Sequence, residues 1–403
     1  MRVLIDYRPA LRERSGVGET THQLVTALLA LSAAGSLDRP LDLTLFSSSW
    51  KDRVVATPDL AGATVLDRRV PVRLLNLAWH RLGWPPAERL TGRAFDVTHS
   101  PSPLLLPARH AAQVVTIHDL DFLSHPERTR AEIRRDYPTL APAHALRADR
   151  IIVPSAFTAG QVEQRLGVPR DRLSVCPPGV PGWTPRATVP TDGYVLFFGT
   201  LEPRKNIGGL LDAYERLLLD PAGFAAPAQG ETGHGQRDAG TGRGNGRQPI
   251  PDLVLAGKAT EAARMWLDRL ERPPLKGVVR HVGYVDPDRR RALYEGARLL
   301  VMPSFEEGFG MPVLEAMSLG VPVVAANRGS LPEVLGDAGP LVDPEQPAEL
   351  AQAIGRLLWD DPHAATCAAR GLARARQFNW AATARRVYDT YVEAIEHRRC
   401  ASA

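Results

Sequence analysis

Cysteine is scarce in this 403-residue sequence, and long apolar runs are absent. The three cysteines, Cys176, Cys367 and Cys400, have neither the spacing of a metal site nor that of a disulfide framework, so we expect a reducing, cytoplasmic compartment. No apolar run reaches the ~18 residues that a membrane span needs. The N-terminal segment Met1–Asp6 has the pattern of a strand, and we therefore expect no signal peptide.

Neither sign of charge dominates the chain. Lysine and arginine number 49 against 45 acidic residues, so the net charge is +4 and the pI is about 9.1. A mildly basic protein suits an anionic small molecule or an anionic membrane surface, and it does not require a nucleic acid. The hydrophobic content of 44% is ordinary for a globular protein, and the length allows two domains with separate cores.

Short β-branched runs alternate with helical patterns along the whole chain. This alternation predicts an α/β protein with two doubly wound, Rossmann-like domains, residues 1–178 and 193–376, joined by a linker at 179–192. Each domain would bind its ligand at the carboxyl ends of the strands, and a cleft between the domains is the expected active site. The predicted strands are Arg2–Asp6, Leu41–Ser47, Asp96–His99, Gln113–His118, Arg150–Pro154, Leu173–Pro177, Tyr194–Gly199, Asp252–Ala256, Val278–Val285, Leu299–Pro303, Pro322–Ala326 and Pro340–Val342.

Three further segments complete the predicted organisation. Leucines at helical spacing predict a helix over Thr20–Ala33. An apolar stripe over Phe378–His397 predicts a helix, and we expect residues 377–403 to pack back across the first domain. Residues 223–251 have a Gly-rich core with almost nothing to bury, which predicts a disordered insertion. Because this tract lacks a strand-to-helix context, we reject it as a phosphate-binding loop.

Two glutamates, Glu307 and Glu315, are separated by seven residues in a block with the pattern of a strand, a Gly-rich turn and a helix. The strand pattern ends at Ser304, and the helical pattern follows Pro312 and stops at Gly320. This order places backbone N–H groups and a helix N-terminus beside two carboxylates. A phosphate-bearing ligand with hydroxyl groups fits, because the amides take the anion and the carboxylates take the hydroxyls.

Two adjacent cations, Arg204 and Lys205, follow the predicted strand Tyr194–Gly199 and precede a helical pattern. A basic pair at this place suits a diphosphate, since arginine binds it in a forked manner and lysine acts as a point charge. A solvated pair on a surface loop explains the same sequence equally well. The first loop contains Gly16-Val17-Gly18, and by itself this pattern also fits a plain tight turn.

Histidines end two predicted strands of the first half. His118 would donate a hydrogen bond to a substrate or relay a proton there, and the alternative is a structural histidine supported by Asp119. The sequence Asp119-Leu120-Asp121 resembles a metal–phosphate pattern, but no third ligand is visible, so we expect no metal. His99 either lines the expected cleft or serves the structure alone.

Basic and aromatic residues are concentrated in Val72–Leu90 and Arg128–Arg150. An amphipathic, basic, Trp-bearing face can rest on an anionic membrane or receive a lipid-linked substrate. The alternative is that the tryptophans belong to the core and the charges form a solvated face. The sequence leaves both interpretations open.

Taken together, these blocks resemble the family 4 retaining glycosyltransferases of the GT-B fold, and the resemblance covers nearly the whole chain. It is strongest from Tyr194 to Pro344. In the first domain, Thr116–Leu120 and Val153–Ser155 look like segments of bacterial mannosyltransferase-like members. The specific marks of the second half are Gly199–Asn206, Leu255–Gly257, Val282–Val285, the Glu307/Glu315 block and Pro332–Val334.

The resemblance implies a role for each matching residue. Arg204 and Lys205 would bind the donor diphosphate and stabilise the leaving nucleotide, and Gly16 would let the backbone approach the same phosphates. Glu315 would hold the ribose hydroxyls, and His118 would contact the sugar near the reacting centre. The first loop departs from the family, because many members have an aromatic residue soon after its second glycine. The other implied donor-binding residues are Glu307, Gly308, Phe309 and Gly310 for the sugar, Tyr284 and Val285 for the nucleobase, and Gly199 and Gly257.

The implied function is transfer of a hexose, with mannose favoured, from a nucleotide-diphosphate sugar to a glycan or lipid-linked acceptor in cell-envelope polysaccharide biosynthesis. His118, Glu307, Arg204 and Lys205 form the expected catalytic set. GDP-mannose is the favoured donor and a co-substrate, and we expect no cofactor, no metal and no nucleic acid partner. Contact with the inner face of a membrane is left open. The alternatives are a sugar-nucleotide epimerase of the same fold and a non-catalytic nucleotide-sugar binder.

Overall fold

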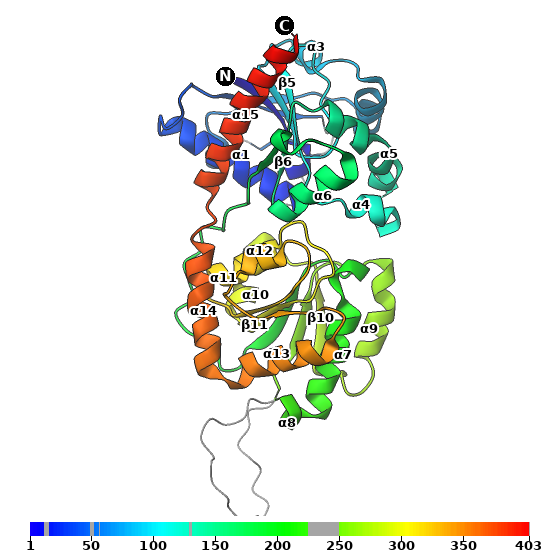
Figure 1. The fold of residues 1–403 in the computed structure, drawn as a ribbon, viewed down its shortest axis with the longest axis vertical. Coiled ribbons are helices and arrows are strands. Elements are labelled where there is room, and N and C mark those ends of the chain that lie inside the picture. The colour runs from blue at the N-terminus through cyan, green and yellow to red at the C-terminus, as the bar shows by residue number, and fades with distance from the viewer. Residues whose placement is uncertain (12–15, 49–51, 56, 129–130, 225–249, 403) are drawn as a thin grey trace, which may run out of the picture. The chain divides into compact units, whose positions relative to one another are not determined.

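The computed structural model describes residues 1–11, 16–48, 52–55, 57–128, 131–224 and 250–402. The chain divides into two compact units (Figure 1). The first unit comprises Met1–Pro181, Glu307–Met311 and Arg376–Ala403, and the second comprises Gly182–Glu306 and Pro312–Ala375.

The first unit is built on a seven-stranded parallel sheet in the order β3-β2-β1-β4-β5-β6-β7. The chain builds outward from β1 to β3 and then returns to β4 on the other side of β1. At such a switch point the loops diverge and leave a crevice at the carboxyl ends of the strands. The strands are β1 (Arg2–Asp6), β2 (Asp42–Ser47), β3 (Thr64–Asp67), β4 (Val97–Ser100), β5 (Ala112–Thr116), β6 (Arg150–Val153) and β7 (Leu173–Val175).

Alternate side chains of these strands enter cores on opposite faces of the sheet. Val3 and Ile5 of β1 pack in a core with residues of α1 and α15, whereas Leu4 packs in another core with Trp79. Helices α1 and α15 lie against each other, although they come from opposite ends of the chain (Figure 1). The helices of this unit are α1 (Val17–Ala33), α2 (Val72–Leu77), the π-helix η3 (Ala78–Leu82), α3 (Ala87–Thr91), α4 (Asp121–Ser124), α5 (Ala131–Arg147), α6 (Ala156–Leu166), α15 (Trp380–Ser402) and the short η1 (Arg8–Ala10), η2 (Pro58–Leu60), η4 (Pro126–Arg128) and η5 (Arg170–Arg172).

The second unit has a six-stranded parallel sheet in the order β10-β9-β8-β11-β12-β13, with its switch point between β8 and β11. Both units are therefore doubly wound α/β structures, as the sequence predicted. The strands are β8 (Tyr194–Phe198), β9 (Leu253–Ala256), β10 (Val279–Gly283), β11 (Ala297–Met302), β12 (Val323–Ala326) and β13 (Leu341–Val342). The helices are η6 (Pro203–Lys205), α7 (Ile207–Leu219), α8 (Pro221–Phe224), η7 (Glu261–Ala263), α9 (Arg264–Leu270), α10 (Pro287–Glu295), α11 (Met311–Ser318), α12 (Leu331–Leu335), α13 (Pro347–Trp359) and α14 (Asp361–Ala375).

The structure adds one strand that the sequence did not predict and corrects several predicted strand ends. Strand β3 was missed because it is a short, half-exposed edge strand without a strong apolar pattern. Strand β5 ends at Thr116, before His118, and β10 ends at Gly283, where a positive φ of 72° stops the extended backbone. Of the predicted insertion, residues 225–249 lie outside the described residues, and α8 covers its beginning.

No helix within the described residues is both long and apolar enough to cross a membrane.

Candidate functional site

A short basic turn lies at the switch point of the second sheet. After β8, residues Pro203–Lys205 form a single 3-10 turn, and Asn206 begins α7 with a left-handed φ of 54°. The Asn206 Oδ1 accepts a hydrogen bond from the Gly209 N–H at 3.2 Å, and its Nδ2 donates to the Pro344 carbonyl at 2.7 Å. Asparagine is one of the few residues besides glycine that tolerate this conformation. Asn206 therefore fixes the turn that carries both predicted cations.

Arg204 and Lys205 are held by the protein and are not a solvated surface pair. The Arg204 Nε lies 2.6 Å from Oε1 of Glu202, and its Nη1 donates to the Glu306 carbonyl at 3.2 Å. The Arg204 carbonyl accepts from the Phe305 N–H at 2.8 Å. The Lys205 side chain is only 7% exposed. These bonds join the loop after β8 to the loop after β11 and place the cations where the sheet opens.

Three glycines lie side by side at the carboxyl ends of β8, β9 and β10. The Gly199 N–H donates to the Ala256 carbonyl and the Gly257 N–H donates to the Gly283 carbonyl, each at 2.8 Å. A Cβ on Gly257, whose φ is 137°, would overlap the carbonyl oxygen of Gly199. The Lys205 Cε lies 3.8 Å from the position that a Cβ on Gly199 would take. Bare backbone beside an ammonium group is suited to close approach by a phosphate.

The residues predicted to face a nucleobase follow β10. Tyr284 is exposed, and the Lys258 Nζ lies 5.0 Å from the centroid of its ring. Val285 is partly buried. The contact of this segment with a base stays a prediction.

Glu315 is buried inside α11 and has a cationic neighbour that the sequence did not reveal. The Arg290 Nη1, from α10, lies 3.5 Å from Oε1 of Glu315. Burial, and then the Glu315 carboxylate, raises the pKa of the buried Tyr294 well above its ordinary value. A carboxylate balanced by a guanidinium still has lone pairs for hydroxyl groups. Arg290 was missed because it is the middle one of three consecutive arginines, and only packing shows which of them faces inward.

The Gly-rich turn Glu307–Met311 belongs to the first unit. The Gly308 carbonyl accepts hydrogen bonds from Ser155 Oγ at 2.7 Å and from Thr158 Oγ1 at 3.0 Å. A Cβ on Gly308 would overlap the carbonyl oxygen of His118. The structure thus brings together two predicted elements, His118 and this turn. Thr158 was missed, since only Ser155 belonged to a recognised segment.

The other residues of this turn are also constrained. Glu307 and Phe309 are both buried, and the Phe309 ring lies edge-on to that of Phe378, with centroids 5.8 Å apart. Gly310 has a φ of 102°, which strongly favours glycine. A rigid turn of this kind can present its amides and the Glu307 carboxylate in fixed directions.

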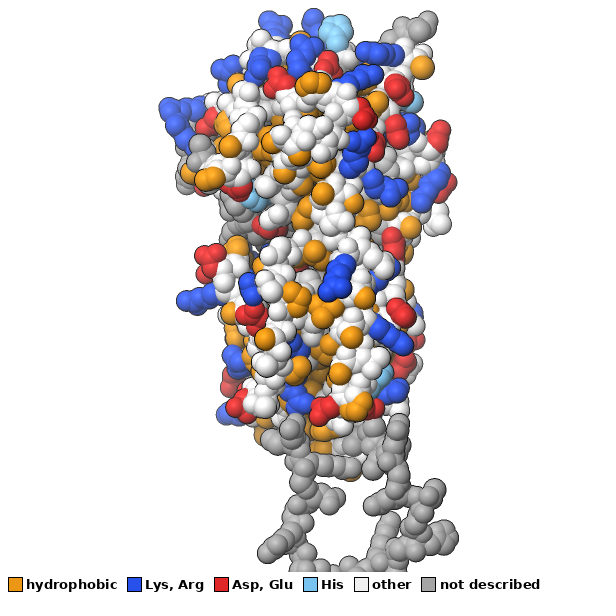
Figure 2. All heavy atoms as spheres, turned by 90° about the vertical axis from the view of Figure 1, so that its left-hand side faces the viewer, with side chains coloured by type: hydrophobic (Ala, Val, Ile, Leu, Met, Phe, Trp, Pro, Cys, Tyr) orange, Lys and Arg blue, Asp and Glu red, His pale blue; other side chains and the backbone are white. Residues whose placement is uncertain are grey.

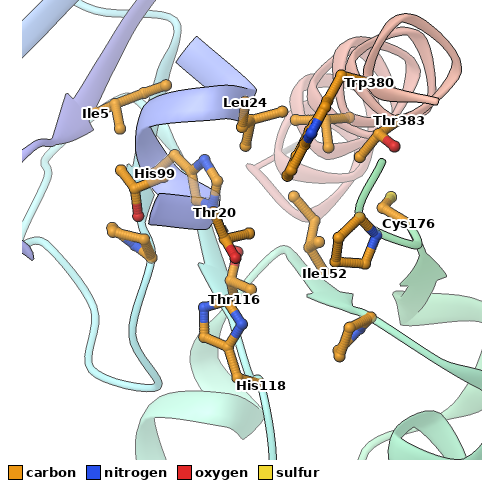
Figure 3. Close-up of a pocket in the computed structure, with 15 residues that line it drawn as sticks. Ile5, Thr20, Leu24, His99, Thr116, His118, Ile152, Cys176, Trp380 and Thr383 are labelled. Atoms are coloured by element: carbon orange, nitrogen blue, oxygen red, sulfur yellow. Dashed lines mark hydrogen bonds between the residues drawn. The ribbon is translucent and has the colours of Figure 1, made fainter. Parts of the chain in front are cut away.

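A narrow apolar cavity lies at the switch point of the first sheet (Figure 3). Its volume is about 30 Å³, which admits a few water molecules or a single ligand group but no whole hexose. The lining side chains come from the central strands, from α1 and from α15, and include Ile5, His99, Thr116, His118 and Trp380.

The two histidines of this cavity differ in their hydrogen bonding. The His99 Nδ1 lies 2.8 Å from Tyr391 Oη, its Nε2 lies 2.8 Å from Thr116 Oγ1, and burial lowers its pKa to about 3. His99 is therefore a satisfied structural residue. Burial also lowers the pKa of His118, against the opposing effect of Asp119. Its Nε2 is buried and has no hydrogen-bond partner among the described residues, so a neutral imidazole remains to bind a ligand group.

Two remaining predictions concern the first loop and metal binding. Gly16 caps α1 with a φ of 54°, and nothing lies within 4 Å of the position its Cβ would take, whereas residues 12–15 of this loop lie outside the described residues. Asp119 Oδ1 accepts the Asp121 N–H at 3.2 Å at the start of α4. Across the described ranges, no group of three His, Cys, Asp or Glu side chains is placed to hold a metal ion.

Comparison with known proteins relates both halves of the chain to enzymes. Residues 15–181 match the family model described as Glycosyltransferase Family 4, and residues 246–360 match the model described as Glycosyl transferases group 1. The chain is 33% identical to the O-antigen chain mannosyltransferase B of Escherichia coli in an alignment of 404 positions that covers 94% of this chain and 96% of that relative.

Solved structures confirm the predicted GT-B fold. A sucrose-phosphate synthase from Thermosynechococcus elongatus matches with a TM-score of 0.71 and 20% identity, covering 97% of this chain and 98% of that one. WaaG, a glycosyltransferase involved in lipopolysaccharide biosynthesis, matches with a TM-score of 0.66 and 13% identity, covering 96% and 99%. At such identities the likeness concerns the fold alone.

Proposed function

This chain belongs to glycosyltransferase family 4, and on that premise we propose that it transfers mannose from GDP-mannose to a hydroxyl of a glycan or lipid-linked acceptor, with retention of the anomeric configuration. The name of the Escherichia coli relative, a mannosyltransferase, supports the choice of sugar. We also propose that the enzyme needs no metal ion and works in the cytoplasm at the membrane surface.

The observation that carries this proposal is the edge of the second sheet. There the backbone of three glycines, Gly199, Gly257 and Gly283, is free of side chains. The buried Lys205 and the fixed Arg204 lie at the same edge. This combination suits a diphosphate, because cations and backbone amides bind it without bulky neighbours. The buried carboxylate of Glu315 supplies acceptors for ribose hydroxyls.

The charges fit the chemistry of the transfer. Breaking the bond between C1 of the sugar and the phosphate develops negative charge on the leaving diphosphate, and fixed cations stabilise it. The positive charge that develops on the sugar carbon is stabilised by a nearby carboxylate, a role we assign to Glu307. His118, neutral because its pKa is lowered, would hold a sugar hydroxyl through its buried Nε2.

We propose front-face attack as the route to retention, because no carboxylate nucleophile is identifiable. The acceptor oxygen bonds to C1 on the side from which the phosphate leaves, and the departing phosphate oxygen takes the acceptor proton. Mass spectrometry of the enzyme with donor alone tests this route: a covalent sugar on an acidic side chain would refute it. Full activity in the presence of a chelator is expected if no metal takes part.

A thermal-shift panel of GDP-, UDP-, ADP- and dTDP-sugars tests the donor. A ligand that binds only the folded state raises the melting temperature, and we expect the largest rise with GDP-mannose. Incubation with donor but without acceptor then separates the alternatives, because an epimerase would still convert the sugar. Tight donor binding without turnover on a broad acceptor panel would indicate a binder. A panel in which no sugar nucleotide raises the melting temperature would overturn the proposal.

A further inference from the structure

The segment Val72–Trp84 of the first unit exposes large apolar side chains to solvent. Helices α2 and η3 bury Leu75 and Trp79 in the core, which are 2% and 1% exposed. The residues on the opposite face of these helices, and those just after them, point outward. The exposed fractions are 61% for Leu74, 52% for Leu77, 71% for Leu82 and 55% for Trp84.

The two tryptophans of this segment divide between the two interpretations that the sequence left open. Trp79 is a core residue, and its Nε1 donates to the Pro85 carbonyl at 3.0 Å. Trp84 is exposed, and the guanidinium of Arg89 lies 5.6 Å from its ring centroid. Single exposed apolar residues are ordinary, and this segment stands out because four of its large apolar side chains are each more than half exposed.

The charge around this apolar face is positive. Glu88 is the one acidic residue between residues 68 and 93, and its carboxylate accepts backbone N–H groups of Arg109 and His110 at 3.0 and 3.2 Å. Arg81 pairs with Asp136 at 3.1 Å and Arg93 pairs with Asp42 at 3.6 Å, so part of the positive charge is offset. The arginines of the same stretch are Arg68, Arg69, Arg73, Arg81, Arg89 and Arg93.

A cavity of about 340 Å³ lies beside η3, within the usual range of small-ligand sites, roughly 300–1,000 Å³. Arg81 and Arg147 line it, and no carboxylate does so among the described residues. His144 also lines it but is uncharged there, because its Nδ1 accepts the Leu105 N–H at 2.9 Å and burial lowers its pKa. The polar lining is thus suited to a phosphate group.

We propose that this face docks on an anionic lipid bilayer. The exposed leucines and Trp84 enter the boundary of the acyl chains, and a lipid phosphate binds in the cavity between Arg81 and Arg147. Apolar insertion beside arginines is how interfacial segments hold to anionic membranes. The inference rests on the proposed function in one respect, since docking on the bilayer would bring the enzyme to a lipid-linked acceptor.

A second basic region of the first unit serves as an internal comparison. Figure 2 shows lysine and arginine side chains gathered at the end of this unit where both chain termini lie. A cavity of about 380 Å³ there is lined by Arg2, Arg39, Arg398 and Arg399, and also by Asp96, which pairs with Arg2 at 3.2 Å. None of the exposed large apolar side chains of the described residues lies in its lining. This region therefore has the positive charge expected of a membrane-binding surface, but it lacks exposed apolar side chains that could enter the bilayer.

Sedimentation of the full chain with phosphatidylglycerol–phosphatidylcholine vesicles tests the proposal. The wild type is expected to bind the mixed vesicles, and to bind them less at high salt. It is not expected to bind vesicles of pure phosphatidylcholine. The variant Leu74→Gln/Leu77→Gln is expected to bind at least tenfold more weakly, because two anchors are lost. Arg147→Gln is expected to weaken binding roughly fivefold, the share of one arginine at an anionic surface.

Two matched controls show whether vesicle binding is specific to this face or comes from exposed apolar side chains or positive charge in general. Leu219→Gln/Met265→Gln removes two side chains of the second unit that are 74% and 66% exposed, and Arg398→Gln/Arg399→Gln removes charge from the second basic region. Both are expected to bind like the wild type. Wild-type binding by the Leu74/Leu77 variant, equal loss in either control, or no binding by the wild type would overturn the proposal. The shift of melting temperature by sugar nucleotides is read in every variant, so failure of docking is separate from failure of the proposed function.

Discussion

Replacing Lys205 with methionine tests the proposed donor site most directly, because it removes one charge and keeps a side chain of similar length. Lys205 is 7% exposed, and its Cε lies beside the end of β8. A methionine fills about the same space, so the packing contribution to the free energy of unfolding should change by less than ~1.5 kcal/mol. Any larger effect on turnover then reports the missing ammonium group.

The size of that effect follows from electrostatics. Two unit charges about 4 Å apart interact by roughly 4 kcal/mol at an effective dielectric constant near 20. Removing one fixed group that stabilises developing negative charge costs ~2.7–4 kcal/mol, or about 100- to 1,000-fold in kcat. The charge on the leaving phosphate grows toward the transition state, so KM should change less than kcat.

The assay is steady-state kinetics with GDP-mannose and acceptor, in which the rate of GDP release is measured. Circular dichroism checks that the variant is folded. Lys276→Met is the matched control, since Lys276 is exposed in the segment before β10 and is not among the proposed donor-binding residues. Near-native turnover of Lys205→Met would refute the assignment of this lysine. Equal losses in both lysine variants would show that the effect is not specific to the proposed site.

Three further predictions concern stability and reactivity. Gly257→Ala is expected to lower the free energy of unfolding by about 1–3 kcal/mol or more, measured by urea denaturation. The reason is that residue 257 has a φ of 137° and its Cβ would overlap the Gly199 carbonyl oxygen. Because the pKa of His99 is lowered from 6.5 to about 3, its contribution to stability is full above pH 6.5 and is lost as the pH falls toward 3, by up to about 1.4 kcal/mol per pH unit. His99→Gln should therefore flatten the decline in stability between about pH 6.5 and about pH 3. An alkylating reagent followed by mass spectrometry is expected to modify the exposed Cys400 first and Cys176 last, since burial raises the pKa of Cys176 to about 12.

Each of these predictions has an outcome that contradicts it. Wild-type stability of Gly257→Ala would mean that the backbone at the end of β9 relaxes easily. An unchanged pH slope in His99→Gln would show that other groups account for the acid sensitivity. Modification of Cys176 at the rate of Cys400 would mean that the core around it opens readily.

Much of the local structure could be predicted because local sequence records it. The predicted strands Arg2–Asp6 and Pro322–Ala326 coincide with β1 and, within one residue, with β12. Strands buried on both faces of a parallel sheet form continuous apolar runs, and these are visible without any tertiary information. Strand β3 lacks such a run, since it lies at an edge and is half exposed.

The candidate site was predictable only in part. The spacing of Glu307 and Glu315 and the pair Arg204–Lys205 indicated a ligand that carries phosphates and hydroxyls. The sequence did not indicate that Arg290 accompanies Glu315, because this pair joins residues on two different helices. Such contacts depend on how separate elements pack.

The sequence by itself determined the alternation of elements, the two doubly wound units and the glycines at strand ends, because backbone preference and apolar periodicity act over a few residues. Only the tertiary structure decided which histidine is satisfied, His99 through Tyr391 and Thr116, and which keeps a buried nitrogen for a ligand, His118. It also decided that Trp79 is core and Trp84 is surface. The physical reason is that burial and hydrogen-bond partners are set by residues far away in the chain, and no local pattern records them.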